Sequence, residues 1–176
     1  MRAQLWFVTM VSLAAACRGG QDSGTPEQTA PQAAAPATSN LPDTTAAALW
    51  AYLRQVDYSQ NWRLWPGKDR LYKGTEPHGM LLTTYVNDLA LDALTNGAQN
   101  MPPGALIVKE NYMPDSTLAA ITTMYRVQGY DAQHQDWFFA KHDPQGKVEV
   151  AGRVQMCQSC HQTAAGGGYL FSTRPR

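Results

Sequence analysis

The sequence contains few cysteines, few charged residues and no excess of charge of either sign. Three cysteines, Cys17, Cys157 and Cys160, are too few for a disulfide framework in a chain of 176 residues, so their placement needs another explanation. Lysine and arginine together number 14, as do aspartate and glutamate. This balance gives no sign of a nucleic-acid-binding surface or of a polybasic membrane patch. With 44% hydrophobic residues, the chain can still form an ordinary globular core.

The N-terminus has the pattern of an export signal. A single positive charge, Arg2, precedes an apolar run at 5–16, which is too short to span a membrane comfortably. The run ends in Leu13-Ala14-Ala15-Ala16-Cys17, which resembles a bacterial lipoprotein signal. We therefore predict that a lipidated Cys17 anchors the protein to a membrane, in the periplasm or cell envelope. Ordinary cleavage, which would leave a free Cys17 thiol, is the alternative.

Residues 18–45 consist mainly of Gly, Gln, Ser, Thr, Pro and Ala and contain almost no large apolar side chains. Such a segment cannot bury enough surface to offset the cost of ordering it, so a disordered tether is predicted. The chain is thus divided into a signal peptide at 1–17, a tether at 18–45 and one folded domain at 46–176.

Hydrophobic periodicity predicts an α+β fold for this domain, with an antiparallel β-sheet and flanking helices. Leu49, Trp50, Leu53 and Val56 recur at helical spacing, which predicts a helix that ends near residue 57. A short helix around 157–162 is expected to be the last element. The other expected elements are strands at 80–86, 105–112 and 120–130, a helix at 88–94, and a hairpin of 137–141 with 148–154, whereas 61–79 is expected to be mostly loop.

The most informative motif is Cys157-Gln158-Ser159-Cys160-His161, which has the C-x-x-C-H form of a c-type haem attachment sequence. Residues three and four apart share one face of a helix, so both thiols and the imidazole point the same way. The thiols of Cys157 and Cys160 can form thioethers with the two vinyl groups of one haem. His161 then binds the iron as the proximal ligand. The sequence therefore predicts one covalently attached haem c.

Two other interpretations of the motif fit less well. A structural zinc site would need a fourth ligand, and the remaining histidines, His78, His134 and His142, are scattered along the chain. We interpret His78 as a turn residue and expect His134 and His142 to be exposed. A thiol redox motif normally opens a helix in a βαβ unit, whereas this motif follows antiparallel hairpin strands.

Further segments of the chain resemble the cytochrome P-460 family. They include Trp-Arg-Leu-Trp-Pro-Gly, Pro-His-Gly and Tyr-Val-Asn, and the resemblance covers nearly all of about 50–171. It implies a sheet with flanking helices, shared with the beta class of cytochromes c′ and usually dimeric. It also implies a high-spin haem with His161 on one side and an open distal position. The segments are 62–67, 77–79, 85–87, 105–112, 124–127, 129–131, 136–138, 146–148, 157–161 and 169–171.

The same resemblance points to Lys109 and Arg126 as candidate catalytic residues. Type members of the family oxidise hydroxylamine and have a lysine joined covalently to the haem ring, which Lys109 matches by position. Strand alternation puts Lys109 on the face of Ile107 and Asn111, without showing which face is inward. Hydroxylamine oxidisers of the family place a proton-accepting carboxylate over the iron, from the next strand. Arg126 is the best match there, and a permanent cation would instead steady an anion or a haem propionate.

The predicted function is redox chemistry on hydroxylamine or nitric oxide, at the five-coordinate iron of an exported monohaem cytochrome with an electron-transfer partner. We expect the protein to form a homodimer and to have no nucleic-acid partner. Two alternatives stay open: an electron carrier with a filled sixth position, and a module that binds nitric oxide without turnover. Met80, Met101, Met113 and Met124 could supply a sixth ligand, although core packing is the simpler interpretation of each.

Overall fold

The computed structural model describes residues 41–171, all of which belong to one compact unit of the chain. The predicted signal peptide at 1–17, Cys17 and residues 18–40 of the predicted tether lie outside the described residues. Residues 41–45 pack against the domain, and the Tyr125 hydroxyl donates to the Pro42 carbonyl oxygen at 3.1 Å. Within the described part, no helix is long and apolar enough to cross a membrane.

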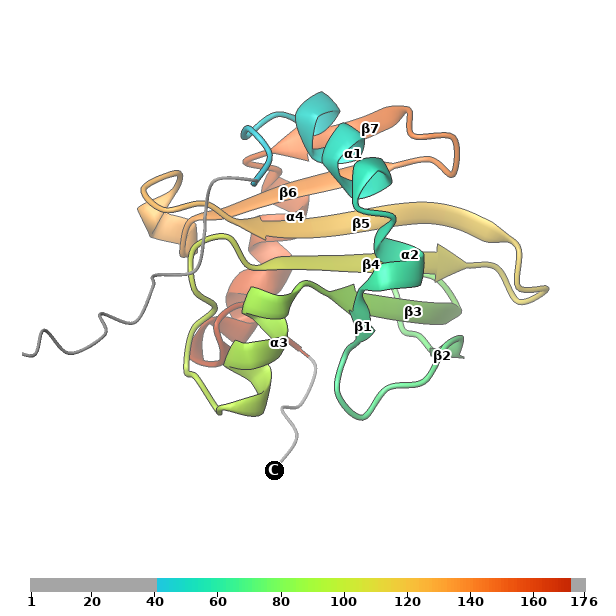
Figure 1. Cartoon of the computed structure of the whole chain (residues 1–176), viewed down its shortest axis with the longest axis horizontal. Helices are drawn as coiled ribbons and strands as arrows, with labels where there is room; N and C mark the ends of the chain where they lie inside the picture. The colour runs from blue at the N-terminus through green and yellow to red at the C-terminus, as the bar shows by residue number, and fades with distance from the viewer. Residues whose placement is uncertain (1–40, 172–176) are drawn as a thin grey trace, which may run out of the picture. The chain divides into compact units, whose positions relative to one another are not determined.

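An antiparallel sheet of seven strands forms the middle of the described domain, in the order β1-β3-β4-β5-β6-β7, with β2 also paired to β3 (Figure 1). The predicted α+β fold is confirmed. The two-residue strands β1 and β2 lie in the segment expected to be loop, because they are too short to show a periodicity and form only by pairing with β3. The strands are β1 (Arg63–Leu64), β2 (Tyr72–Lys73), β3 (Leu81–Val86), β4 (Leu106–Tyr112), β5 (Leu118–Arg126), β6 (Trp137–His142) and β7 (Val148–Gly152).

Helices cover both faces of this sheet. In Figure 1, α1 and α2 cross the near face and α4 lies behind the strands. Helix α1 begins where the Thr45 hydroxyl accepts a hydrogen bond from the backbone N–H of Ala48, at 3.2 Å, a typical N-terminal cap. The helices are α1 (Ala46–Gln55), α2 (Tyr58–Asn61), α3 (Asp88–Thr95) and α4 (Gln155–His161), with 3₁₀ turns η2 (Ala132–His134) and η3 (Gln162–Gly167).

Strand β4 sends its side chains alternately into two hydrophobic clusters. Leu106 and Val108 pack with Leu49 and Leu53 of α1 on one face. Ile107 belongs to the cluster on the other face, with residues of α3 and of the chain after η3. Lys109 shares the face of Ile107, so the structure answers the question that alternation left open: Lys109 lies on the α4 side of the sheet.

Asn87 joins the start of α3 to the start of β4. Its side-chain oxygen accepts from the backbone N–H groups of Ala90, at 3.1 Å, and Leu106, at 3.0 Å. Its side-chain amide donates to the carbonyl oxygen of Gly104 at 2.9 Å. One buried side chain therefore satisfies three backbone groups, which positions β4 and the residues that it carries.

Two histidines differ from the sequence expectation. His142 is completely buried, stacks on Trp50 with ring centroids 5.1 Å apart, and has a pKa lowered by burial. His134 is only partly exposed, and its Nδ1 lies 3.0 Å from a carboxylate oxygen of Asp131. The expectation of exposure was wrong for both because contacts distant in the sequence cover them: α1 packs on His142, and the ring of Tyr169 lies 6.5 Å from that of His134, between centroids.

The methionines that could have supplied a sixth ligand differ in how exposed they are. Met101 is 3% exposed in the hydrophobic core, as expected. Met80 and Met113 are 53% and 52% exposed, so the expectation of core packing was wrong for these two. They lie at the ends of strands, where the sheet is not covered.

Candidate haem-binding site

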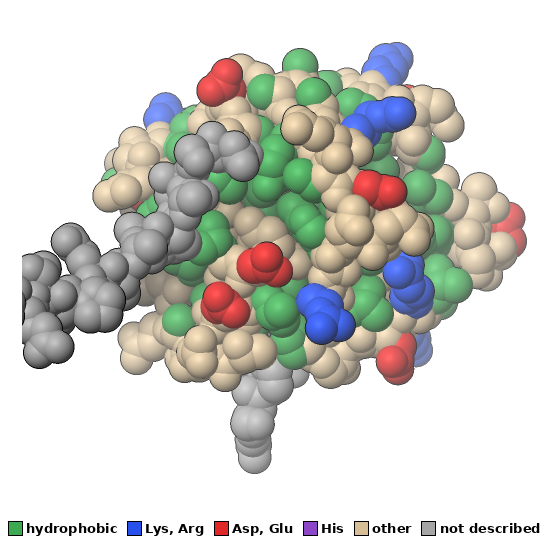
Figure 2. All heavy atoms as spheres, in the orientation of Figure 1, with side chains coloured by type: hydrophobic (Ala, Val, Ile, Leu, Met, Phe, Trp, Pro, Cys, Tyr) green, Lys and Arg blue, Asp and Glu red, His purple; other side chains and the backbone are tan. Residues whose placement is uncertain are grey.

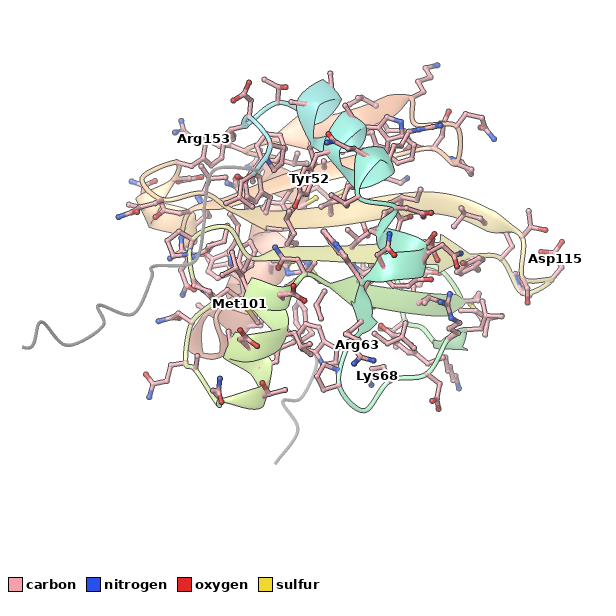
Figure 3. The ribbon with its side chains drawn as sticks, in the orientation of Figure 1. Tyr52, Arg63, Lys68, Met101, Asp115 and Arg153 are labelled. Carbon is pink, nitrogen blue, oxygen red and sulfur yellow. The ribbon has the colours of Figure 1, made fainter. Side chains whose placement is uncertain are left out.

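A cavity of about 760 Å³ lies on the α4 side of the sheet. This volume is within the range of about 300–1,000 Å³ that is usual for small-molecule and cofactor sites. Strands β3 to β6 form its floor, α4 and the chain at 170–171 form another wall, and the segment at 72–79 closes a third side. Lys68, which lies in the loop between β1 and β2 (Figure 3), also lines the cavity.

Helix α4 presents the whole motif to this cavity. Cys157, Cys160 and His161 all line it, as their spacing on one helical face predicts. Both thiols are free, Cys157 partly buried and Cys160 exposed, and burial raises the pKa of the Cys157 thiol. The structure therefore brings together the three residues that the sequence assigned to haem attachment.

His161 is held in the orientation that a metal ligand needs. Its Nδ1 lies 2.7 Å from the backbone carbonyl oxygen of Tyr169, to which it donates. Tyr169 is itself 2% exposed, so this carbonyl has a defined position. The bond selects the tautomer with the lone pair on Nε2, which is the usual arrangement of a metal-binding histidine. Burial lowers the pKa of His161, which favours the neutral ring further.

Gln158 does not line the cavity and instead anchors α4 to the loop after β5, a role that the sequence analysis did not assign. Its side-chain amide donates to a carboxylate oxygen of Asp131 at 2.7 Å, and Gln158 is only 6% exposed. The same Asp131 oxygen lies 3.0 Å from Nδ1 of His134 and 3.7 Å from Nε of Arg153. The local sequence gives no signal of this role, because Asp131 is distant from Gln158 in the chain.

Lys109 reaches the cavity from β4, where its neighbours across the sheet are Thr84 on β3 and Thr122 on β5. Within residues 41–171, no carboxylate forms an ion pair with it. Burial, and next the positive charge of Lys68, lower the pKa of Lys109 from 10.5 to about 8. A shift of this size corresponds to about 3 kcal/mol against the charged form. A partly buried lysine without an ion-pair partner at a cavity is therefore costly, which is typical of functional positions.

Arg126 is not brought to the cavity. It lies at the end of β5, where its Nη1 is 3.1 Å from a carboxylate oxygen of Asp136. Residues 120, 122 and 124 of β5 line the cavity, and the wall ends before Arg126. The prediction that Arg126 steadies an anion or a haem propionate therefore finds no geometric support, because Asp136 already neutralises its charge.

His78 does line the cavity, although the sequence gave it only a turn role. Its ring centroid is 6.4 Å from that of His161, and its Nδ1 lies 3.0 Å from Oδ1 of Asn111. Burial, and next the charge of Lys109, lower the pKa of His78 to about 4. Gly79 allows the loop to lie this close, since a Cβ there would be 2.7 Å from backbone atoms of Tyr112. The close packing is tertiary, so the local sequence carried no signal of it.

An unsatisfied donor in the cavity wall fits the carboxylates of a haem. Trp65 is 2% exposed, and among the described residues nothing accepts from its indole N–H. Lys68 and Lys73 line the same cavity, which adds positive charge suited to propionates. In contrast, no group of three His, Cys, Asp or Glu side chains in the described part could hold a metal ion, so the zinc interpretation lacks a ligand set.

The face opposite this cavity shows no comparable concentration of charge. Figure 2 views the side that carries α1 and α2, where basic and acidic side chains are interspersed among apolar ones. The haem motif and Lys109 lie on the other side of the sheet, at the cavity.

Comparison with known proteins agrees with this site. The family model of cytochrome P-460 matches residues 59–172, which is more than half of the chain and includes the cavity walls and the haem motif. No curated protein matches the chain. The fold, the motif and the family match lead to one conclusion: the chain belongs to the cytochrome P-460 family and is a cytochrome that binds haem.

Proposed function

We propose that the protein is an exported monohaem cytochrome c that performs redox chemistry on hydroxylamine or nitric oxide. Cys157 and Cys160 hold the haem through thioethers, and His161 binds its iron. The observation that supports this best is one cavity that joins the haem motif of α4 to the partly buried, unpaired Lys109 of β4. The bound haem supplies an iron that changes oxidation state and accepts a small ligand on its distal side.

The residues around the cavity suit this chemistry. Oxidation of hydroxylamine releases protons as well as electrons, so a group that accepts protons near neutral pH assists it. As long as its amine is not joined to the haem ring, Lys109, with a pKa of about 8, is the cavity residue best placed to do so. Electrons leave to a separate electron-transfer partner. In line with the family resemblance, we also propose a homodimer.

The function is tested with holoprotein made in a host that attaches haem c. We expect nitric oxide to change the optical spectrum of the ferrous protein and hydroxylamine to reduce an added electron acceptor catalytically. A Lys109→Met variant should lose at least tenfold of that turnover but keep its haem. The control is Lys147→Met, because Lys147 is exposed in the turn between β6 and β7 and does not line the cavity. If nitric oxide binds but hydroxylamine is not turned over, the protein is a nitric-oxide-binding module and not an oxidase. If neither molecule changes the protein, it is an electron carrier.

We further propose that acylated Cys17 anchors the protein on the outer side of a membrane, on a tether of residues 18–45. A single acyl chain binds a membrane only marginally, so stable anchoring needs the several chains of a lipoprotein. In a fractionated bacterial host, wild type should sediment with membranes, and Cys17→Ser should be released as soluble protein. Equal partition of the two into the soluble fraction would contradict the anchor.

A further inference from the structure

A buried carboxylate, Glu110, lies on the face of the sheet opposite the haem cavity, where alternation along β4 places it with Val108. Glu110 is 6% exposed, and within residues 41–171 no cation forms an ion pair with it. The Tyr58 hydroxyl donates to its Oε1 at 2.9 Å, and the Tyr112 hydroxyl donates to its Oε2 at 2.6 Å. Two neutral phenols therefore offset a charge that is costly to bury.

Tyr58 belongs to a row of aromatic rings on the same face of the sheet. Its ring lies edge-on to that of Tyr85, with centroids 5.4 Å apart. Trp62 is the next ring, 6.2 Å from Tyr58, and Tyr52 of α1 (Figure 3) lies 6.4 Å from Trp62. Rings at these separations are in contact. Because Trp62 and Tyr52 are partly exposed, the row leads from the sheet to the molecular surface.

The inner end of the row stands on the floor of the haem cavity. Tyr85 follows Thr84 in β3, and the Thr84 side of this strand lines the cavity. Consecutive Cα atoms of a chain are 3.80 Å apart, so the backbone of Tyr85 is itself part of the wall that separates the cavity from the row. The strand that bears Tyr85 thus connects the two faces of the sheet.

The charges around the inner tyrosines differ. Arg70 donates to the Tyr85 hydroxyl, and its guanidinium lies 5.3 Å from the centroid of the Tyr85 ring. A cation there disfavours the loss of an electron from Tyr85. Tyr58 instead faces the carboxylate of Glu110, which can accept the phenolic proton and leave a neutral radical. Tyr112 shares that carboxylate, but within residues 41–171 no ring contact joins it to the row.

We propose that the row from Tyr85 to Tyr52 is a protective relay, which carries oxidising equivalents from the haem to the surface when hydrogen peroxide reacts with the protein. Peroxide takes two electrons from the haem and, with two protons from solvent, becomes two water molecules. Tyr58 replaces one of these electrons, which passes through Tyr85, while its O–H bond breaks and the proton moves to Oε1 of Glu110. A separate one-electron donor replaces the other.

The oxidised site then moves outward. An electron from Trp62 refills Tyr58, the proton returns from Glu110 to the phenol, and the indole of Trp62 loses its own proton to solvent. Oxidation is thereby directed to the surface and away from the haem. This activity rests on the proposed haem attachment and is independent of hydroxylamine oxidation.

Electron paramagnetic resonance tests the relay in ferric holoprotein that is mixed with one equivalent of hydrogen peroxide and rapidly frozen. We expect the signal of a protein radical in wild type. Tyr58→Phe should reduce this signal at least fivefold, as should Glu110→Gln, which cannot take up the proton. Tyr130→Phe is the matched control, because Tyr130 is partly buried against Phe138 outside the row, and it should give the wild-type signal.

Protection is measured as the rate at which excess peroxide bleaches the optical bands of the haem. Tyr58→Phe should bleach at least threefold faster than wild type and keep its hydroxylamine turnover, since Tyr58 does not line the cavity. The relay is wrong if wild type forms no protein radical, if the signal persists at full strength in Tyr58→Phe, or if the two proteins bleach equally fast. Each of these results would leave the proposed function intact, whereas extraction of haem from wild type by acid–acetone would refute the attachment itself.

Discussion

Replacing both Cys157 and Cys160 with alanine will give a protein that loses all of its haem to acid–acetone, whereas wild type keeps its colour. Thioether bonds survive extraction, and axial coordination by His161 alone does not. The measurement compares haem in the protein pellet with haem in the solvent, after expression with a haem-attachment system. This is the largest effect that we expect, since it separates complete retention from complete loss.

A matched control lies in the same helix. Met156 precedes Cys157 and is 70% exposed, so Met156→Ala removes a side chain of α4 without removing a thiol. It should retain haem as wild type does. Single Cys157→Ala and Cys160→Ala variants should each retain one thioether and resist extraction. Complete extraction of haem from wild type would show that the cysteines do not attach it.

A covalent bond between Lys109 and the haem ring is the second large effect that we expect. Joining the amine to a ring carbon removes two protons and two electrons, so an oxidant such as hydrogen peroxide must accept the electrons. The bond distorts the macrocycle, which shifts the optical bands. An intact digest should contain the Lys109 peptide joined to the haem peptide of 157–161, and ferrous wild type should absorb at unusually long wavelength. Lys109→Ala should show an ordinary c-type spectrum.

The pH dependence of this reaction distinguishes Lys109 from an ordinary lysine. Only the neutral amine attacks, and burial lowers the pKa of Lys109 to about 8. The rate of bond formation should therefore rise about tenfold per pH unit up to about pH 8 and then level off. For a solvated lysine, the rate of bond formation would continue to rise up to about pH 10.4. The rate is measured by mass spectrometry of digests after addition of peroxide at each pH.

Lys141 is the control for Lys109. It lines the same cavity from β6, but its side chain is 40% exposed and its Nζ lies 2.7 Å from a carboxylate oxygen of Glu149. Lys141→Ala should leave the cross-link and the long-wavelength spectrum unchanged. Recovery of the unmodified Lys109 peptide in full yield from wild type would eliminate the bond and favour a nitric-oxide binder of the cytochrome c′ type.

The sequence was a good guide wherever the relevant contacts are local. The haem motif was readable because residues 157, 160 and 161 share a helical face whatever surrounds them. The strands at β3, β4 and β6 were predicted to within a few residues, since each is long enough to show its pattern. The helix expected at 88–94 is α3, and it ends shortly before Gly97, which adopts a left-handed conformation with φ of +67°.

The positions of the site residues depend on contacts between segments that are distant in the sequence. Sequence alternation placed Lys109 with Ile107 and Asn111, but both faces of β4 are covered, so hydrophobicity did not distinguish them. Arg126 matched a family position by its place in a strand, yet the turn after β5 brings Asp136 to it. His78 stands 83 positions before His161 in the sequence, and only the packing of its loop against β4 puts the two rings in one cavity.

The sequence by itself therefore determined the haem motif and the α+β class with its main strands. The export signal stays a prediction from the sequence. The motif and the strands depend on spacings of a few residues, which helices and strands repeat in any protein. The tertiary structure alone decided that Lys109 faces α4, that Arg126 pairs away from the cavity, and that His78 approaches His161. Each of these results from contacts between segments distant in the sequence, whose pairing depends on how the whole domain buries its apolar surface.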